Sequence, residues 1–169
     1  MFRIYIISLF LTIAFTSFAS EEDSLKKIEG KWYINMTDFK MWLTGKKQNP
    51  TFNYWIETRS GVVGLKDHVT YTQRNKTKKY KGFDKPLNSN ATSFVWKGDG
   101  LLFFIKTKWQ IIYQNDAFAI VHYDKTFATS EGCDVISRLK SLDETTISAI
   151  KIKLKDLGIT KELTIIKQQ

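Results

Sequence analysis

Eight short segments with the pattern of β-strands follow one another through most of the chain, and no helical pattern separates them. Apolar and polar residues alternate within them, which is typical of strands that bury one face. Parallel strands need crossover helices, so strands without intervening helices favour an antiparallel barrel or sandwich. The sequence therefore predicts an all-β fold. The expected strands cover residues 31–36, 51–59, 68–74, 78–87, 92–96, 109–113, 118–124 and 132–139.

One helix and a short final strand are expected after the last of these segments. Ser141 and Glu144 have the spacing of a capping box, in which each side chain bonds the other residue's backbone N–H. An apolar stripe at helical spacing follows, and Gly158 is a natural helix terminator. The stripe consists of Ile147, Ile150, Leu154 and Leu157, and the final strand is expected over residues 163–166.

Two motifs stand at opposite ends of this series of strands. Gly30 and Trp32 form a G-x-W on the first strand, and Ser137 and Arg138 form an S-R just before the helix. In this order the motifs resemble those of the lipocalin family. The resemblance implies an eight-stranded antiparallel up-and-down barrel with one C-terminal α-helix and a short final strand. It also implies that Trp32 plugs the closed end of the barrel and that Arg138 lies across its ring, gaining about 0.5–2 kcal/mol of cation–π energy.

Three further segments are expected to cover, extend or connect the strands of this barrel. Residues 39–43 are expected to form a loop or helical turn over its mouth, and residues 101–106 to extend the sheet. Residues 75–77 read as a hairpin turn. The motif that lipocalins usually carry between two late strands is represented only by Asn115-Asp116 before Phe118, which leaves the register of that hairpin open.

The first 19 residues have the organisation of a secretory signal peptide. Arg3 precedes an apolar run that ends at the small-x-small site 17–19. This run is too short to cross a bilayer comfortably, and no later stretch is apolar enough for a transmembrane segment. We therefore expect residues 20–169 to form one lipocalin-like domain that is exported, either secreted or periplasmic.

A closed eight-stranded barrel can hold one small ligand, and strand alternation predicts which side chains face it. If Trp32 points inward, every second residue along the strands lines the interior. The expected ligand-binding residues are Ile34, Met36, Tyr54, Ile56, Val69, Tyr71, Phe94, Trp96, Trp109, Ile111 and Tyr113. Their apolar and aromatic character favours a small hydrophobic molecule, lipid-like or aromatic. The alternative is that these side chains simply fill the barrel.

Basic residues cluster around the expected turn at 75–77, in a chain whose net charge is +9. They crowd positive charge at one rim of the barrel, where an anionic glycan or another anionic surface could bind. An exported chain gives no reason to expect specific nucleic-acid binding, and such a run can also simply keep a sheet edge soluble. The cluster consists of Arg74, Lys76, Lys78, Lys79 and Lys81.

An enzymatic function on the same scaffold is a third hypothesis. His68 and His122 are the two histidines, each beside an aspartate, Asp67 or Asp124. Adjacent residues on a strand face opposite sides, so neither aspartate is placed to orient its histidine. No cysteine or histidine spacing indicates a metal site, and no cofactor motif is present. The sequence therefore favours a binding protein without cofactor or catalytic residues.

Overall fold

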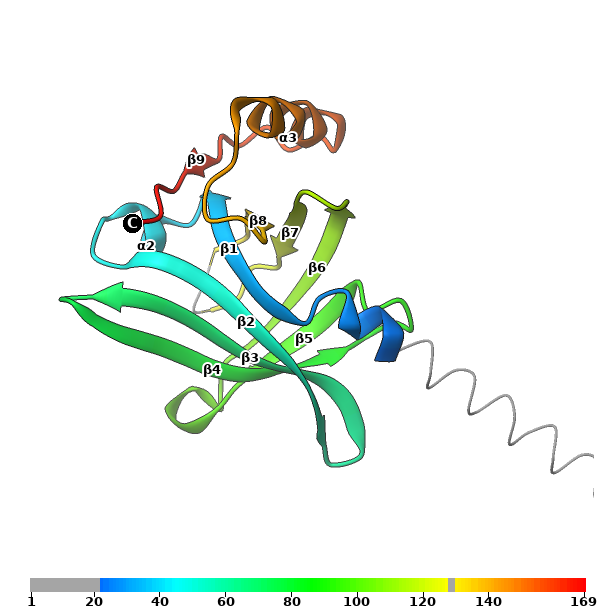
Figure 1. Cartoon of the computed structure of the whole chain (residues 1–169). Coiled ribbons are helices and arrows are strands. Elements are labelled where there is room, and N and C mark those ends of the chain that lie inside the picture. The colour runs from blue at the N-terminus through cyan, green and yellow to red at the C-terminus, as the bar shows by residue number, and fades with distance from the viewer. Residues whose placement is uncertain (1–21, 128–129) are drawn as a thin grey trace, which may run out of the picture.

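A computed structural model describes residues 22–127 and 130–169 of the chain, and the expected leader, residues 1–19, lies outside them. Antiparallel strands form one sheet that closes on itself (Figure 1). The barrel strands are β1 (Gly30–Thr37), β2 (Gln48–Arg59), β3 (Val62–Gln73), β4 (Lys76–Pro86), β5 (Ser93–Gly98), β6 (Lys106–Gln114), β7 (Ala119–Tyr123) and β8 (Gly132–Ser137). The other elements are α2 (Lys40–Leu43), a 3-10 turn η1 (Gly100–Leu102), α3 (Glu144–Asp156) and β9 (Thr164–Ile165).

Each barrel strand pairs with its neighbours in sequence, and β1 closes the barrel by pairing with both β2 and β8. Trp32 on β1 lies opposite Phe52 on β2, and Tyr33 lies opposite Ser137 on β8. The short strand β9 adds to β1 at Met36 and Thr37. The predicted eight-stranded up-and-down barrel, with its C-terminal helix and short final strand, is confirmed.

Two local expectations in the middle of the chain are wrong. Strand β3 begins at Val62 rather than at residue 68, because the tight turn at Ser60 and Gly61 leads directly into it. The hairpin turn after β3 is formed by Arg74 and Asn75, which both have positive φ, and not by residues 75–77. Two-residue turns of this kind match the twist of the strands that they join.

Residues 101–106 do not extend the sheet as expected. They form η1 and a turn, and β6 begins only at Lys106. Leu101, Phe103 and Phe104 are exposed on this loop, whereas Leu102 is only partly exposed. A strand with one buried face would have placed alternate residues in the core, which this exposed segment does not do.

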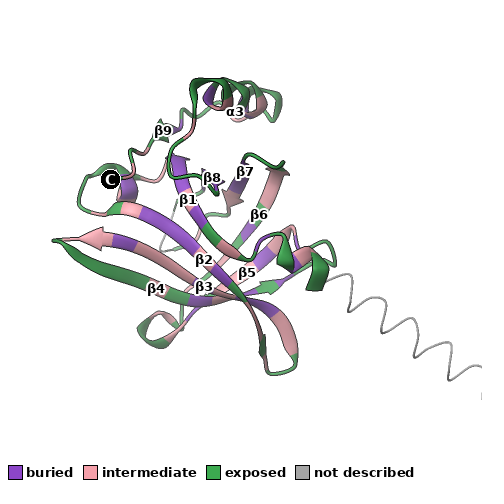
Figure 2. Ribbon diagram, in the orientation of Figure 1, coloured by how far each residue is buried: buried purple, intermediate pink, exposed green. Residues whose placement is uncertain are grey.

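The core has two layers, one inside the barrel and one between the barrel wall and α3. The inner layer includes Trp32, Phe94 and Trp109. The outer layer joins Ile150 and Leu154 of α3 to the outward-facing residues of β7 and β8, with the buried side of the helix turned to the barrel (Figure 2). The apolar stripe of the helix is thus buried as the sequence predicts, except for Leu157, which is exposed.

Asp143 rather than Ser141 is the N-cap of α3. The Asp143 Oδ1 accepts a hydrogen bond from the Thr146 backbone N–H at 2.6 Å, and the helix begins at Glu144. The predicted capping box is therefore wrong by two residues. Gly158, with φ of 72°, follows the helix end as expected.

Candidate ligand cavity

The closed end of the barrel is built around Trp32. The Arg138 guanidinium lies 3.7 Å from the centre of the Trp32 ring, as predicted. Its nitrogens donate hydrogen bonds to three backbone carbonyls, those of Lys27, Glu29 and Lys31, at 2.8 to 3.1 Å. Gly30 has φ of 98°, and a Cβ there would lie 3.1 Å from an Arg138 nitrogen, so glycine leaves room for the guanidinium.

The N-terminal helical turn, residues 22–26, completes this end, as Figure 1 shows. Leu25 and Ile28 are buried against the inner core, and the Ile28 carbonyl accepts a 2.7 Å hydrogen bond from the Trp32 indole. The Trp32 indole N–H thus has a hydrogen-bond acceptor, and the Arg138 guanidinium covers its ring face.

A cavity of about 450 Å³ occupies the interior between this closed end and α2. Phe39, Met41 and Trp42 contribute to its wall, which confirms the expectation that residues 39–43 form a helical turn over the barrel mouth. The remaining wall is largely aromatic, from Phe52, Tyr54, Tyr80, Trp96, Trp109 and Tyr123. Cavities of this size and character suit small ligands.

The structure brings four of the eleven expected ligand-binding residues to the cavity wall: Tyr54, Val69, Trp96 and Trp109. Five more belong to or pack against the inner core without lining the cavity: Ile34, Ile56, Tyr71, Phe94 and Ile111. Phe94 stacks on Trp109, with ring centroids 4.4 Å apart, and so fills space behind the wall. Whether any of these side chains touches a ligand stays a prediction.

Met36 and Tyr113 do not face the interior, and their expected inward placement is wrong. A β-bulge lies between Ile34 and Met36, and another lies between Ile111 and Tyr113. One extra residue reverses the side to which the next side chain points, so both side chains join the outer core beneath α3. Strict alternation cannot anticipate a bulge.

Three aspartates lie inside the barrel and were not among the expected site residues. Asp67 and Asp134 line the cavity, and Asp84 lies behind its wall. Asp134 Oδ1 accepts a 2.6 Å hydrogen bond from the Thr37 hydroxyl, and Asp84 Oδ1 accepts one of 2.6 Å from the Trp109 indole. One oxygen of Asp67 and one of Asp84 have no hydrogen-bond partner.

Burial governs the ionisation of these carboxyl groups. Loss of solvation raises the pKa of Asp67 well above its usual range, and the neighbouring Asp84 raises it further. Burial likewise raises the pKa of Asp84, and it raises the pKa of Asp134 to about 7. Two neighbouring buried carboxyl groups resist carrying charge together, because each carboxylate repels the other.

Gly82 allows Trp96 to approach Asp67. It pairs with Asp67 across β3 and β4, and with Gly98 across β4 and β5. A Cβ at Gly82 would collide with the Trp96 indole, so the ring lies over β4 only because glycine stands there. The Trp96 indole nitrogen is buried and makes no hydrogen bond of good geometry, although its proximity lowers the pKa of Asp67 somewhat. The Trp96 indole N–H, which has no acceptor, therefore lies beside an Asp67 oxygen that has no donor.

Lys47 is the basic residue in the cavity wall. Its ammonium group donates a 2.7 Å hydrogen bond to the Tyr80 hydroxyl and lies within 6 Å of three ring centres, those of Trp42, Tyr71 and Tyr80. This cation is thus held by α2 and the neighbouring aromatic side chains at the mouth of the barrel.

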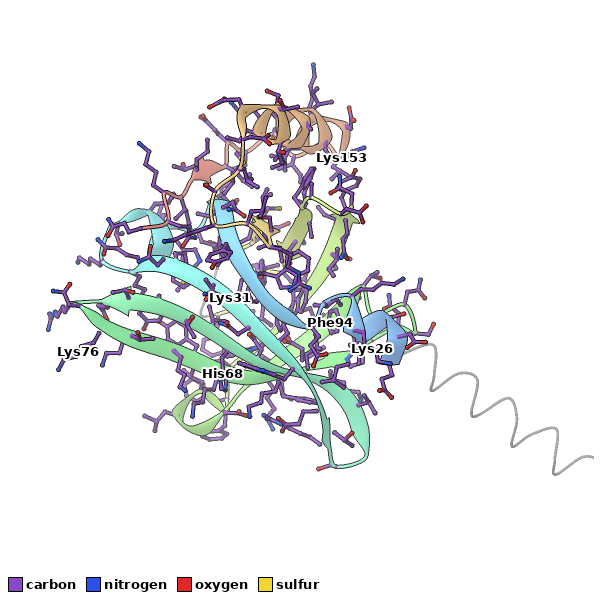
Figure 3. All side chains as sticks on the ribbon, viewed as in Figure 1. Lys26, Lys31, His68, Lys76, Phe94 and Lys153 are labelled. Atoms are coloured by element: carbon purple, nitrogen blue, oxygen red, sulfur yellow. The ribbon has the colours of Figure 1, made fainter. Side chains whose placement is uncertain are left out.

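The basic cluster lies together on the β3–β4 hairpin, with Lys76 at its tip (Figure 3). Its five members, Arg74, Lys76, Lys78, Lys79 and Lys81, are all exposed. The two histidines lie apart, on β3 and β7, which are not neighbours in the sheet. His122 bonds Glu131 at 2.9 Å, and His68 packs on Trp55. No group of acidic, histidine or cysteine side chains within residues 22–127 and 130–169 is arranged to hold a metal ion.

A signal for the missed aspartates was present in the alternation. Asp67 has the same parity as Val69 and Tyr71, which were expected to face inward, but the expected strand began at residue 68. Asp84 has the same parity as Tyr80 on β4. Extending the inward parity of β3 to its true start would have placed Asp67 inside, whereas no residue of β4 was expected to face inward.

No protein-family model and no curated protein matches the sequence. Solved structures do match the fold. Insecticyanin from the tobacco hornworm Manduca sexta aligns with a TM-score of 0.67 and 10% identity over 86% of this chain and 80% of its own. The siderocalin Ex-FABP aligns with a TM-score of 0.61 and 13% identity over 84% and 95%. Lobster apocrustacyanin A1 aligns with a TM-score of 0.59 and 12% identity over 83% and 77%.

These likenesses extend over 83% to 86% of this chain. No helix in the described part of the chain is both long and apolar enough to cross a membrane. The closed barrel, the C-terminal helix and these solved structures lead to one conclusion: the chain has the lipocalin fold.

Proposed function

We propose that this protein is an exported binding protein that carries or sequesters a small, largely apolar ligand inside its barrel. The observation that carries this proposal is the cavity of about 450 Å³, whose wall is rich in aromatic side chains. A barrel filled by its own side chains would not leave such a space. Among the structures that share the fold, Ex-FABP is a siderocalin with dual ligand specificities, which supports a binding role for this type of barrel. Export is supported by the leader sequence before residue 20.

Tryptophan emission provides a direct test, because Trp96 and Trp109 line the cavity. A ligand that displaces water from these indoles should shift their emission. Titration with a fatty acid, a retinoid and a naphthalene dye should give saturable changes at micromolar concentrations, about −8 kcal/mol of binding free energy. The Trp96→Phe variant should lose part of the signal, whereas Trp55→Phe, on an exposed outer position, should not.

Native mass spectrometry of the protein purified from its own host gives an independent measurement. A co-purifying small molecule supports the proposal. Flat emission across the whole panel, together with protein that carries no added mass, would show that the barrel is not a carrier.

The exposed basic hairpin favours a second candidate function, the binding of a polyanion such as an anionic glycan. Its charge lies on the turn residue Arg74 and on four lysines of β4, and all five side chains are exposed. Reversing Lys76, Lys78 and Lys79 to glutamate should abolish retention on a heparin column and leave the fold intact. If the variant is retained as strongly as the unaltered protein, charge elsewhere is responsible and this function is excluded.

A further inference from the structure

We propose that the ligand is an organic cation, an aromatic or apolar body with a protonated amine, and that its ammonium group binds Asp67 beside Asp84. This inference rests on the proposed carrier function, since it names the chemical class of ligand that the same cavity selects. The geometry of the two carboxyl groups and of the surrounding aromatic wall carries it.

The first observation is that two buried carboxyl oxygens beside the cavity have no hydrogen-bond partner, and the Trp96 indole N–H next to Asp67 makes no hydrogen bond of good geometry with them. Asp67 is 3% exposed and Asp84 is fully buried, yet Asp67 Oδ1 and Asp84 Oδ2 have no hydrogen-bond partner. Buried polar atoms are almost always paired in folded proteins, and unpaired ones cost free energy. Asp67 lines the cavity, so a ligand placed there can supply the missing donor.

The second observation concerns charge. Asp67, Asp84 and Asp134 all lie inside the barrel, whereas the cavity wall has one basic side chain, Lys47, which is bound to the Tyr80 hydroxyl. No protein cation is paired with Asp67 or Asp84 among the described ion pairs. An ammonium group would supply both a positive charge and up to three N–H donors. An anionic ligand head placed at the same point would meet unpaired carboxyl groups.

The third observation separates an organic cation from a metal ion. Within the described residues, no acidic, histidine or cysteine side chains lie close enough together to form a metal site. The wall around Asp67 is formed instead by aromatic side chains such as Tyr54, Trp96 and Trp109. Aromatic rings attract organic ammonium groups and also pack against an apolar body. The cavity thus combines an unpaired carboxyl oxygen with aromatic side chains, and an amphiphilic amine matches both.

Three ligands that share one ring system test this inference: naphthylmethylamine, naphthalenemethanol and naphthoate. Calorimetric titration of the purified protein should give an affinity for the amine about ten-fold or more higher than for the alcohol, with the carboxylate weakest. The Asp67→Asn variant should bring the amine and the alcohol to similar affinities, because an amide offers the ammonium group no negative charge. Asp134→Asn is the matched control, because Asp134 lines the same cavity but already has Thr37 as its partner.

Proton release provides a second readout that needs no variant. Burial raises the pKa of Asp67 well above its usual range, so in the free barrel the carboxyl keeps its proton to a higher pH than an exposed aspartate does, and forming an ammonium–carboxylate pair should release that proton. The alcohol should release none. Asp134, Tyr54, Tyr80, Tyr123 and Lys47 also line this space, and Asp84 lies behind its wall. Comparing the two ligands cancels their common contribution.

The outcomes separate this inference from the carrier function. If the amine and the alcohol bind equally and release no protons, the cation site is excluded while the carrier function stands. If Asp67→Asn and Asp134→Asn reduce the preference for the amine equally, the assignment to Asp67 is wrong. If neither these ligands nor the apolar panel bind, the carrier function itself fails.

Discussion

At the scale of single residues, the pair of Trp32 and Arg138 shows how a short motif fixes one end of a barrel. The guanidinium covers the indole face and also donates hydrogen bonds to three backbone carbonyls. Two of these carbonyls, those of Lys27 and Glu29, lie just before β1, and that of Lys31 lies on β1, so Arg138 joins the end of β8 to the start of β1. Charge alone would not achieve this, because a planar fork is needed to reach several carbonyls at once.

Replacing Arg138 by alanine should therefore lower the free energy of unfolding by about 1–3 kcal/mol, through lost stacking and unpaired carbonyls. Chemical denaturation provides the measurement. Arg138→Lys keeps the charge but lacks the planar guanidinium, so its free energy of unfolding should lie between those of the unaltered protein and the alanine variant. An alanine variant as stable as the unaltered protein would contradict the role assigned to this contact.

At the scale of elements, the bulges on β1 and β6 determine which side chains each core layer receives. The bulge on β1 sends Met36 to the outer core and brings Thr37 opposite Asp134, where its hydroxyl binds the carboxyl group. The bulge on β6 sends Tyr113 outward, where the Lys153 ammonium of α3 lies 4.8 Å from its ring. Both bulges thus help α3 to dock on the outside of the barrel.

The start of α3 provides a test at this scale. Asp143→Ala should lower the thermal midpoint and speed amide exchange in the first turn of α3, because the Thr146 N–H loses its acceptor. The same bond lowers the pKa of Asp143, so its contribution is present at neutral pH and is lost as pH falls through that lowered value. Ser141→Ala is the matched control and should have little effect. A larger loss of stability in Ser141→Ala than in Asp143→Ala would support the capping box that the sequence predicts.

At the scale of the whole molecule, the buried carboxyl groups make stability depend on pH. Burial raises the pKa of Asp134 from an unfolded value of 3.8 to about 7, so the folded state holds a proton that the unfolded state releases. The resulting stabilisation is complete below pH about 4 and is lost as pH rises to about 7. Ionised aspartates inside the barrel therefore lower its stability near neutral pH unless a ligand pairs with them.

The Asp134→Asn variant, which keeps an acceptor for Thr37, should reveal this dependence. It should match the unaltered protein near pH 4 and become relatively more stable as pH rises, by at most about 1.4 kcal/mol per pH unit. Urea unfolding at several pH values measures the difference. A difference that does not change between pH 4 and pH 8 would show that Asp134 does not titrate in this window.

Local chemistry in the sequence was sufficient to predict the barrel. The alternating segments, the motifs at Trp32 and Arg138, and the apolar stripe of α3 each depend on neighbours in the chain or on a short spacing, so they could be read without a structure. The helical turn over the mouth could be predicted for the same reason.

The cavity was decided only by tertiary structure. A bulge inserts one residue without any marked sequence signal, and this reversed the expected direction of Met36 and Tyr113. Asp67 and Asp84 are diagonal neighbours because β3 and β4 pair in one register, and the Trp96 indole lies over Gly82, the partner of Asp67. Whether inward side chains fill a barrel or leave a space depends on how all of them pack together, and no single segment of the sequence contains that information.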